Sequence, residues 1–203
     1  MPDRLNAEQL RAGIGGGVIG REIVVLEQTG STNDAILQIG NANPKQGLVV
    51  FAEHQTAGRG QRGNRWESAA GKGLWFSILL QPLIVLANSS RLTTWAAEAV
   101  SNAIKKEFAL TPTIKPPNDV QIDGRKVAGV LVEMRAQKKA AHLAIAGIGV
   151  NVNQSLEDFP EELRDKAVSL AMTLGRQVDR QKFTIALLRE LDRTYRARFA
   201  RNT

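Results

Sequence analysis

The dipeptide Asp123-Gly124 restricts the fold of this 203-residue chain more than any other feature of the sequence. It lies between two segments rich in β-forming residues, 120–122 and 126–135. Asp-Gly in such a setting is a strong signal for the turn of a β-hairpin. A hairpin joins antiparallel neighbours, whereas parallel strands need a longer crossover connection. The sequence therefore argues against a doubly wound parallel sheet.

The remaining segments extend this hairpin into an α+β pattern. Runs of apolar and β-branched residues predict further strands at 22–26, 47–52, 74–80 and 142–150. Apolar spacing and N-cap residues predict helices at 31–39, at 90–110 (capped by Ser89 or Ser90), after Pro160, and at 180–199 (capped by Asp179). We predict an α+β fold with a mixed, largely antiparallel sheet and helices on one face.

Composition excludes several kinds of site. The chain has no cysteine and two histidines. Disulfide frameworks, thiolate metal sites and cysteine nucleophiles are therefore excluded, and a zinc centre is disfavoured. The net charge of +7 points to a polyanionic partner: nucleic acid, a phosphorylated ligand or an acidic protein.

The sequence has no feature of a membrane or secreted protein. It has no stretch of about 18 apolar residues, and residues 1–13 lack the apolar core of a signal peptide. We therefore expect a cytoplasmic protein. We also expect residues 1–203 to form a single domain, in which residues 1–20 are a polar, glycine-containing leader.

A glycine-rich segment contains Gly58, Gly60 and Gly63 in the spacing G-x-G-x-x-G. In a dinucleotide-binding fold a helix follows this motif directly, and an acidic residue lies about 20 positions further on. Here residues 66–73 make a poor helix, and the sequence around position 80 is apolar. Gly63 is not followed by Lys-Ser or Lys-Thr, so a Walker A loop is excluded as well.

The same segment carries Arg59, Arg62 and Arg65 and ends at Trp66. Glycine lets the backbone approach an anion closely. Guanidinium groups bind phosphate or carboxylate, and an indole can stack on a base. These residues make the segment a candidate anion site, while a solvated surface loop and a generic nucleic-acid loop stay open on composition alone.

Other polar residues lie at the ends of predicted strands. Residues 115–119 form a rigid polar turn, Lys126 opens the apolar segment 127–133, and the segment 147–153 ends with two asparagines. A strand-boundary role is the ordinary explanation for such a lysine. Turn or cap chemistry is the ordinary explanation for Asn33, Asn118 and Asn151.

Five segments, taken together and in order, resemble the catalytic domain of biotin–protein ligases (biotin–acetyl-CoA-carboxylase ligases). They are Ser31-Thr32-Asn33-Asp34, the loop from Gln55 to Trp66, Lys115-x-Pro117-Asn118-Asp119, residues 126–133 and residues 147–153. The resemblance covers residues 29–153. It implies a fold like that of class II aminoacyl-tRNA synthetases and lipoate ligases, in agreement with the α+β prediction.

The resemblance implies a two-step reaction that uses ATP and Mg²⁺. The carboxylate of biotin attacks the α-phosphate of ATP, giving biotinyl-5′-AMP and pyrophosphate. A lysine of the biotin carboxyl carrier domain of a carboxylase then takes the biotinyl group and releases AMP. Such an enzyme mainly positions its substrates and neutralises phosphate charge, so it needs no Ser-His-Asp set. No tightly bound cofactor is expected.

The resemblance also implies roles for the matching residues. Lys126 and Arg59 are the expected catalytic residues, with Lys126 bridging the biotin carboxylate and the α-phosphate. The expected biotin-binding residues are Ser31, Thr32, Asn33, Gln55, Gly58, Arg59, Gly60, Gln61 and Lys126. The expected ATP-binding residues are Trp66, Lys115, Asn118, Asp119 and Asn151, with Mg²⁺ near Asp119 and Asn151.

Three residues depart from the usual family pattern. The family loop reads GRGRxGRxW, but this chain has Gln61 and Asn64 where arginines are common, and Pro116 where tryptophan is usual. Glutamine forms hydrogen bonds but cannot pair ionically with an adenylate. We therefore expect looser retention of the intermediate, unless Arg62 or Arg65 compensates.

Two whole modules found in many members of the family have no counterpart in the matching segments. We expect neither a winged helix before the ligase core nor a small β-barrel after helix 180–199, and hence no specific DNA binding, while a homodimer stays open. One alternative function is a lipoate- or octanoate-type acyl-protein ligase. Another is a non-catalytic basic protein that binds nucleic acid through Arg189, Arg193, Arg196, Arg198 and Arg201.

Overall fold

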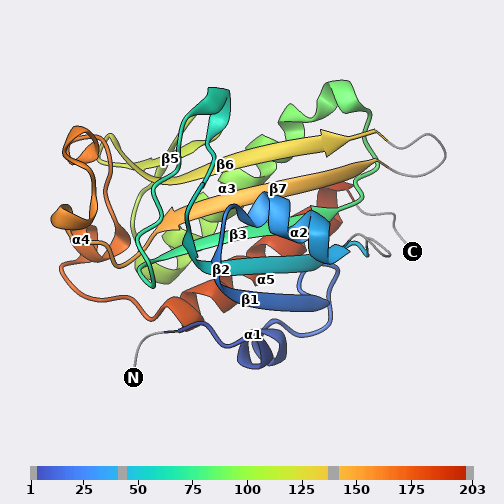
Figure 1. Ribbon diagram of the computed structural model, residues 1–203, viewed down its shortest axis with the longest axis horizontal. Coiled ribbons are helices and arrows are strands. Elements are labelled where there is room, and N and C mark those ends of the chain that lie inside the picture. The colour runs from blue at the N-terminus through green and yellow to red at the C-terminus, as the bar shows by residue number, and fades with distance from the viewer. Residues whose placement is uncertain (1–3, 41–44, 137–141, 200–203) are drawn as a thin grey trace.

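The computed structural model describes residues 4–40, 45–136 and 142–199, and at its centre is one sheet of seven strands (Figure 1). The strand order is β1-β2-β3-β7-β6-β5-β4. β1 and β2 are parallel, and the other neighbouring strands are antiparallel. The prediction of a mixed, largely antiparallel sheet is confirmed. The strands are β1 (Glu22–Thr29), β2 (Leu48–Gln55), β3 (Gly73–Leu80), β4 (Thr113–Lys115), β5 (Asp119–Ile122), β6 (Arg125–Arg135) and β7 (Leu143–Asn151).

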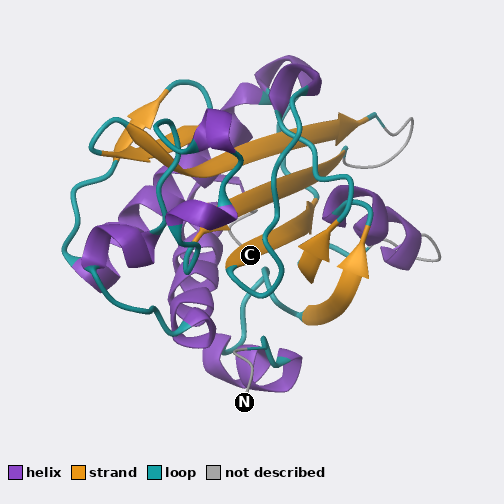
Figure 2. Cartoon of the chain, turned by 60° about the vertical axis from the view of Figure 1, so that its left-hand side comes forward, coloured by secondary structure: helices purple, strands orange, loops and turns teal. Residues whose placement is uncertain are grey.

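Two long helices, α3 (Ser90–Phe108) and α5 (Arg180–Phe199), cover one face of the sheet (Figures 1 and 2). Trp95 of α3 packs against Tyr195 and Phe199 of α5, with ring centroids 5.3 and 5.9 Å away. This aromatic cluster belongs to the main hydrophobic core. Among the described residues, no helix is both long and apolar enough to cross a membrane.

A third helix, α2 (Thr32–Gly40), lies on the opposite face of the sheet, so the prediction of helices on one face is wrong. Its buried residues Ala35 and Ile36 pack in a second core cluster with Val50, Leu79 and Ile145. The reason is topological. α2 connects the parallel strands β1 and β2, and such a crossover must pass over a face of the sheet.

The turn at Asp123-Gly124 connects β5 to β6, as predicted. Asp123 has φ 50° and Gly124 has φ 75°, and positive φ at both central residues is the requirement of a type I′ hairpin turn. Ile122 lies opposite Arg125 across the turn. The hairpin prediction is confirmed.

Residues 7–14 were expected to be part of a polar leader, but they form the helix α1 (Ala7–Ile14). The side chain of Asn6 caps it by accepting a hydrogen bond from the backbone N–H of Gln9 at 2.9 Å. Leu10 is fully buried in the main core. The first part of the chain is therefore integrated into the fold, and the leader prediction is wrong for these residues.

Of the two predicted N-caps, the one at Asp179 is present and the one at Ser89 is not. Asp179 caps α5, because its Oδ1 accepts from the backbone N–H of Lys182 at 2.8 Å. Ser89 makes no capping hydrogen bond before α3 and has helical φ and ψ of −56° and −31°. A 3₁₀ helix, Leu86–Asn88, runs directly into Ser89, so the backbone is already helical where the cap was expected. The short helix after Pro160 is α4 (Leu170–Leu174).

A buried ion pair joins elements that are far apart in the sequence. Arg180, at the start of α5, is 1% exposed and donates to Glu53 of β2 at 2.9 Å and to the carbonyl of Gly73 at 2.9 Å. The other oxygen of Glu53 accepts from the backbone N–H of Leu5 at 2.9 Å. One carboxylate thus connects the N-terminal segment, β2 and α5.

The arginines of α5 are engaged in contacts within the protein. Arg193, Arg196 and Arg198 pair with Glu190, Asp192 and Glu98 at 2.7, 2.9 and 2.5 Å. Arg189 donates to the carbonyl of Gly13. Arg201 lies outside the described residues. Because these cations already have protein partners, the helix offers a poor surface for the phosphates of a nucleic acid.

Candidate active site

The glycines of β6 and β7 leave a flat surface, without side chains, on the face of the sheet that carries α2. Gly129 and Gly149 pair across the two strands, and the indole of Trp66 lies directly on them. A Cβ at Gly149 would overlap this indole, and one at Gly129 would lie 2.7 Å from it. Two residues along, a Cβ at Gly147 would overlap Asn33. The glycine pattern of these strands therefore lets Trp66 and Asn33 touch the sheet.

The glycine-arginine loop, from Gln55 to Trp66, folds as a narrow hairpin across this glycine surface (Figure 1). The N–H of Trp66 donates to the carbonyl of Gly58 at 2.9 Å, and the N–H of Gly60 donates to Asn64 at 2.7 Å. A Cβ at Gly58 would lie 2.5 Å from the carbonyl oxygen of Trp66. Gly58 is thus part of the base of the loop, while Arg59, Gly60 and Gln61 line the cavity below it.

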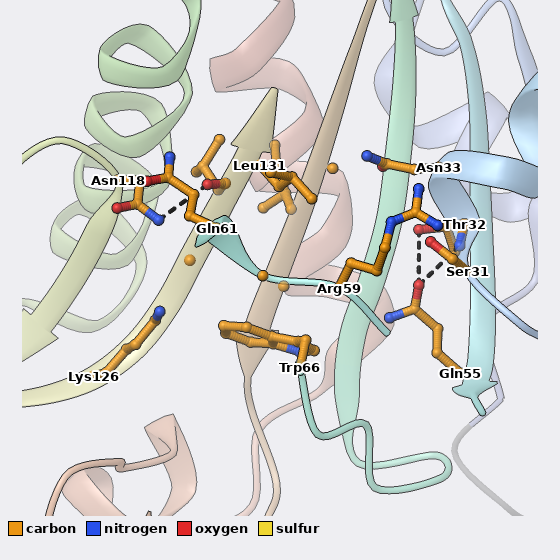
Figure 3. Close-up of a pocket in the computed structure, with 16 residues that line it drawn as sticks. Ser31, Thr32, Asn33, Gln55, Arg59, Gln61, Trp66, Asn118, Lys126 and Leu131 are labelled. Carbon is orange, nitrogen blue, oxygen red and sulfur yellow. Dashed lines mark hydrogen bonds between the residues drawn. The ribbon is translucent and has the colours of Figure 1, made fainter. Parts of the chain in front are cut away.

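The inner cavity has a polar side built by the start of α2 and the end of β2 (Figure 3). The backbone N–H and the hydroxyl of Thr32 both donate to Gln55 Oε1, at 2.8 and 3.1 Å. Gln55 donates in turn to Ser68 at 3.1 Å. The hydroxyl of Ser77 lies 2.8 Å from Thr32 Oγ1 and 2.6 Å from Asn33 Oδ1. This buried network fixes the positions of Thr32, Asn33 and Gln55, and Ser31 lines the cavity beside them.

Arg59 reaches across the cavity mouth to two carboxylates. It donates to both oxygens of Asp34, at 2.5 and 2.9 Å, and lies 3.4 Å from Glu133. The Arg59 guanidinium holds the pKa of Asp34 below its ordinary value through this hydrogen-bonded pairing. Glu133 also accepts from Asn33 at 2.6 Å, so it connects Arg59 to the polar side of the cavity.

Lys126 lies where the inner cavity meets an outer groove of about 510 Å³. Its ammonium is 2.6 Å from Asp119 and 5.1 Å from the centre of the Trp66 ring. The indole N–H of Trp66 is buried and, within the described part of the chain, has no hydrogen-bond partner. In Figure 3, Lys126 and Asn118 lie at the opposite end of the cavity from Asn33 and Thr32.

The candidate ATP-binding residues surround the outer groove and an adjoining hollow. Trp66, Asp119, Lys126 and Asn151 line the groove, and Lys115 and Asn118 line the hollow beside the arginine loop. Asn118 donates to the carbonyl of Val130 at 3.2 Å, and Asn151 donates to those of Lys126 and Val168 at 3.3 and 3.2 Å. Both asparagines therefore also have a structural role, as hydrogen-bond donors to backbone carbonyls.

The donor set fits Mg²⁺ only as an ion that arrives with phosphate. Nowhere among the described residues do three or more His, Cys, Asp or Glu side chains gather into a metal site. Asp119 is one carboxylate at the groove, and it is paired with Lys126. Mg²⁺ commonly binds proteins through one or two carboxylates together with substrate phosphates. The placement of Mg²⁺ near Asp119 and Asn151 stays a prediction.

The sequence comparisons decide the family. The model of the biotin/lipoate A/B protein ligase family matches residues 25–152. The chain belongs to this family. The match contains every candidate residue from Ser31 to Asn151, and all of the segments on which the resemblance was based except the last residue, Asn153.

Individual ligase-family relatives agree with this. The chain is 37% identical to the bifunctional ligase/repressor BirA of Bacillus spizizenii, over 96% of this chain and 60% of the relative. It is 35% identical to the biotin–[acetyl-CoA-carboxylase] ligase of Mycobacterium tuberculosis, over 88% of this chain and 66% of the relative. The chain thus spans about three-fifths of the BirA relative's length.

A solved ligase of the same family has the same fold. The biotin protein ligase from Aquifex aeolicus in complex with biotin and ATP superposes with a TM-score of 0.73 and 32% identity. The superposition covers 86% of this chain and 70% of that chain.

Sequence reasoning gave no role to Asp34, Ser77 or Glu133, which the structure brings to the candidate site of this ligase-family chain. Asp34 and Glu133 lay inside segments that carried the resemblance, but their contacts with Arg59 join residues 25 and 74 positions apart. Ser77 lies within an apolar strand segment, where its one signal was a lone hydroxyl. The sequence contained no local pattern that relates these side chains to one another.

Proposed function

We propose that this chain activates biotin with ATP to form biotinyl-5′-AMP and transfers the biotinyl group to a lysine of a carrier domain. The observation that carries the proposal is the position of Lys126 between the inner cavity, which has a polar end, and the outer groove beside Trp66. The Aquifex relative was solved with biotin and ATP, which supports these two substrates.

In the first step, a carboxylate oxygen of biotin forms a bond to the α-phosphorus of ATP, and the bond to pyrophosphate breaks. Both reacting groups are anionic, so the protein's main task is to bring them together and balance their charge. Lys126 stabilises the carboxylate and the α-phosphate, and Arg59, Gly60 and Gln61 close over them. Ser31, Thr32, Asn33 and Gln55 hold the ureido end of biotin.

The nucleotide occupies the outer groove in this proposal. Trp66 packs against the adenine, and the residues that hold the rest of ATP and its Mg²⁺ are Lys115, Asn118, Asp119 and Asn151. Mg²⁺ balances phosphate charge and enters with ATP. Asp119 releases Lys126 when a phosphate takes its place beside the ammonium.

Arg59 changes partners when biotin binds. The free volume of the inner cavity is about 40 Å³, which is space for only a few water molecules. Arg59 lines this cavity and is held by Asp34 and Glu133. A movement of its side chain toward the biotin carboxylate would open the cavity and bring a cation to the reacting group.

In the second step, the amine of a carrier lysine attacks the carbonyl carbon of the mixed anhydride, AMP leaves, and the amine loses a proton. The carrier is a biotin carboxyl carrier domain of a carboxylase.

Biotin-dependent exchange of labelled pyrophosphate into ATP tests the first step directly. We expect exchange with biotin and Mg²⁺, and little with lipoate or octanoate under the same conditions, because the polar end of the cavity suits a ureido group. Exchange that prefers lipoate or octanoate would assign the chain to another branch of its family. Exchange that proceeds without any acid would contradict the proposal.

Replacing Gln61 by arginine is expected to slow the escape of biotinyl-5′-AMP about tenfold, because a charged donor binds phosphate more strongly than a neutral amide. Gln61 lines both the inner cavity and the hollow beside it. Arg65 already pairs with Glu67 at 3.1 Å. The half-life of the adenylate complex after gel filtration measures the effect.

Gln9→Arg adds the same charge on α1, away from the site, and should leave this half-life unchanged. An equal half-life for Gln61→Arg and the parent protein would show that the missing arginine does not limit retention.

A further inference from the structure

Residues 155–168, which we call the wall segment, form one side of the outer groove. The residues that line the groove from this segment are Phe159, Glu162, Leu163, Lys166 and Ala167. The segment contains two short 3₁₀ helices, Leu156–Asp158 and Glu161–Leu163, and no strand or long helix. Its buried side chains are Phe159, Ala167 and Val168, and contacts at its two ends hold it to the rest of the protein.

At the near end, an ion pair ties the wall segment to the start of β3. The ammonium of Lys72 lies 2.7 and 2.5 Å from the two carboxylate oxygens of Asp158. The backbone carbonyl of Lys72 accepts from the N–H of Asn153 at 2.6 Å. Asp158 also accepts from the N–H and the hydroxyl of Ser155, at 2.8 and 3.0 Å. These contacts fix the first turn of the wall segment.

At the far end, the wall segment holds the backbone of Lys126 on both sides. The N–H of Lys126 donates to the carbonyl of Lys166 at 2.7 Å, and the N–H of Val168 donates to the carbonyl of Lys126 at 3.0 Å. The amide of Asn151 bridges the carbonyls of Lys126 and Val168. A shift of the wall segment would therefore move Lys126 as well.

Asp158 is charged at neutral pH. Burial alone would raise the pKa of its carboxyl group, but the Lys72 ammonium and the Ser155 hydrogen bonds outweigh burial and lower the pKa below its ordinary value. The Lys72 side chain is 42% exposed and that of Asp158 21%. An ion pair with this exposure contributes little to global stability, although it can determine the order of a segment with few other anchors.

We propose that Lys72 and Asp158 are positioning residues for the adenylation step, because their ion pair holds the wall segment and, through it, the backbone of Lys126. This inference rests on the proposed function. It assigns to two residues that line neither the inner cavity nor the outer groove an effect on the ATP half of the site, while the residues proposed to hold the ureido end of biotin lie on other elements.

The test compares Lys72→Met and Asp158→Asn with the parent protein. Asparagine keeps an oxygen that can accept from Ser155, so Asp158→Asn removes mainly the contact with Lys72. Each variant should raise the KM for ATP in pyrophosphate exchange about fivefold, as expected for loss of a partly exposed ion pair. The dissociation constant of biotin, measured without ATP, should change less than this KM, because Lys126 meets only the carboxylate of biotin. Lys72→Arg keeps the ion pair and should retain the parent KM.

Lys106→Met is the matched control, because it removes a lysine–carboxylate pair of similar length, Lys106–Glu190 at 2.7 Å, between α3 and α5. It should leave the KM for ATP unchanged. Equal values of this KM in all variants would overturn the positioning role, as would an equal rise in Lys72→Arg.

Hydrogen exchange of backbone N–H groups tests the positioning role without any measurement of activity, so it can fail independently of the proposed function. The backbone N–H groups of Lys126 and Val168 should exchange about fivefold faster in Lys72→Met and Asp158→Asn, and at the parent rate in Lys72→Arg and Lys106→Met. This holds even for a protein without biotin-dependent exchange activity. Unchanged protection of both N–H groups in Lys72→Met and Asp158→Asn would overturn the inference alone.

Discussion

Lys126→Ala is expected to lower biotin-dependent pyrophosphate exchange about 10²–10³-fold, the usual effect of removing one preorganised contact to a developing anionic group. The reason is its position: the ammonium lines both the inner cavity and the outer groove, beside Trp66 and Asp119. The loss should appear in kcat as well as in kcat/KM, because the contact strengthens as charge moves onto the phosphate.

Two controls separate this effect from a loss of structure. Lys105→Ala removes an exposed lysine of α3 and should keep parent exchange. Urea unfolding of Lys126→Ala should show a midpoint close to that of the parent protein, since the Lys126–Asp119 pair is partly exposed. Exchange that survives in Lys126→Ala would assign the charge balance to another residue.

Glu53→Gln is expected to lower the free energy of unfolding by about 3–5 kcal/mol, the usual range for removing one partner of a buried ion pair. Arg180 would stay in place as a buried cation that lacks the charge of Glu53, since it is 1% exposed. The backbone N–H of Leu5 would also lose a charged acceptor. Urea or guanidinium denaturation monitored by circular dichroism measures the change.

Arg198→Ala provides the contrast, because its pair with Glu98 is exposed and should contribute at most about 1 kcal/mol. The double variant Glu53→Gln/Arg180→Met should lose less free energy of unfolding than the sum of the two single variants. It removes both charges, so no buried charge is left without its partner. A loss below about 1 kcal/mol in Glu53→Gln would mean that this pair does not stabilise the fold.

The parts of the fold that sequence predicted are those with local signals. Asp123-Gly124 needs only two residues with positive φ, and Asp179 needs only the N–H of Lys182. The helices on two faces were missed because the direction of β1 relative to β2 depends on a crossover, not on a pattern within either strand. The helix α1 did carry a signal, the cap residue Asn6 before an apolar Leu10, but the polar residues around it outweighed that signal.

In the candidate site, too, the features with local sequence signals were predicted and those that depend on distant contacts were not. The candidate residues of the five matching segments lie close together: Gly58 is at the base of the loop, and the others line the inner cavity, the outer groove or the adjoining hollow. What sequence could not provide was the pairing of Arg59 with Asp34 and Glu133, since it depends on how α2 and β6 approach the loop. The Lys72–Asp158 contact, which joins residues 86 positions apart, was beyond sequence for the same reason.

The ion pair between Glu53 and Arg180 has a consequence for how the chain folds as it is synthesised. All seven strands precede Arg180 in the sequence. Glu53 therefore leaves the ribosome 127 residues before its partner. The middle of the sheet is also completed late, because β3 pairs with its sequence neighbour β2 on one side but with the distant strand β7 on the other. Pairings of such long range are slow to close. A nascent chain that stops before α5 has every strand of the sheet but lacks the partner of the Glu53 carboxylate in β2, so this part of the fold is completed only after α5 has been synthesised.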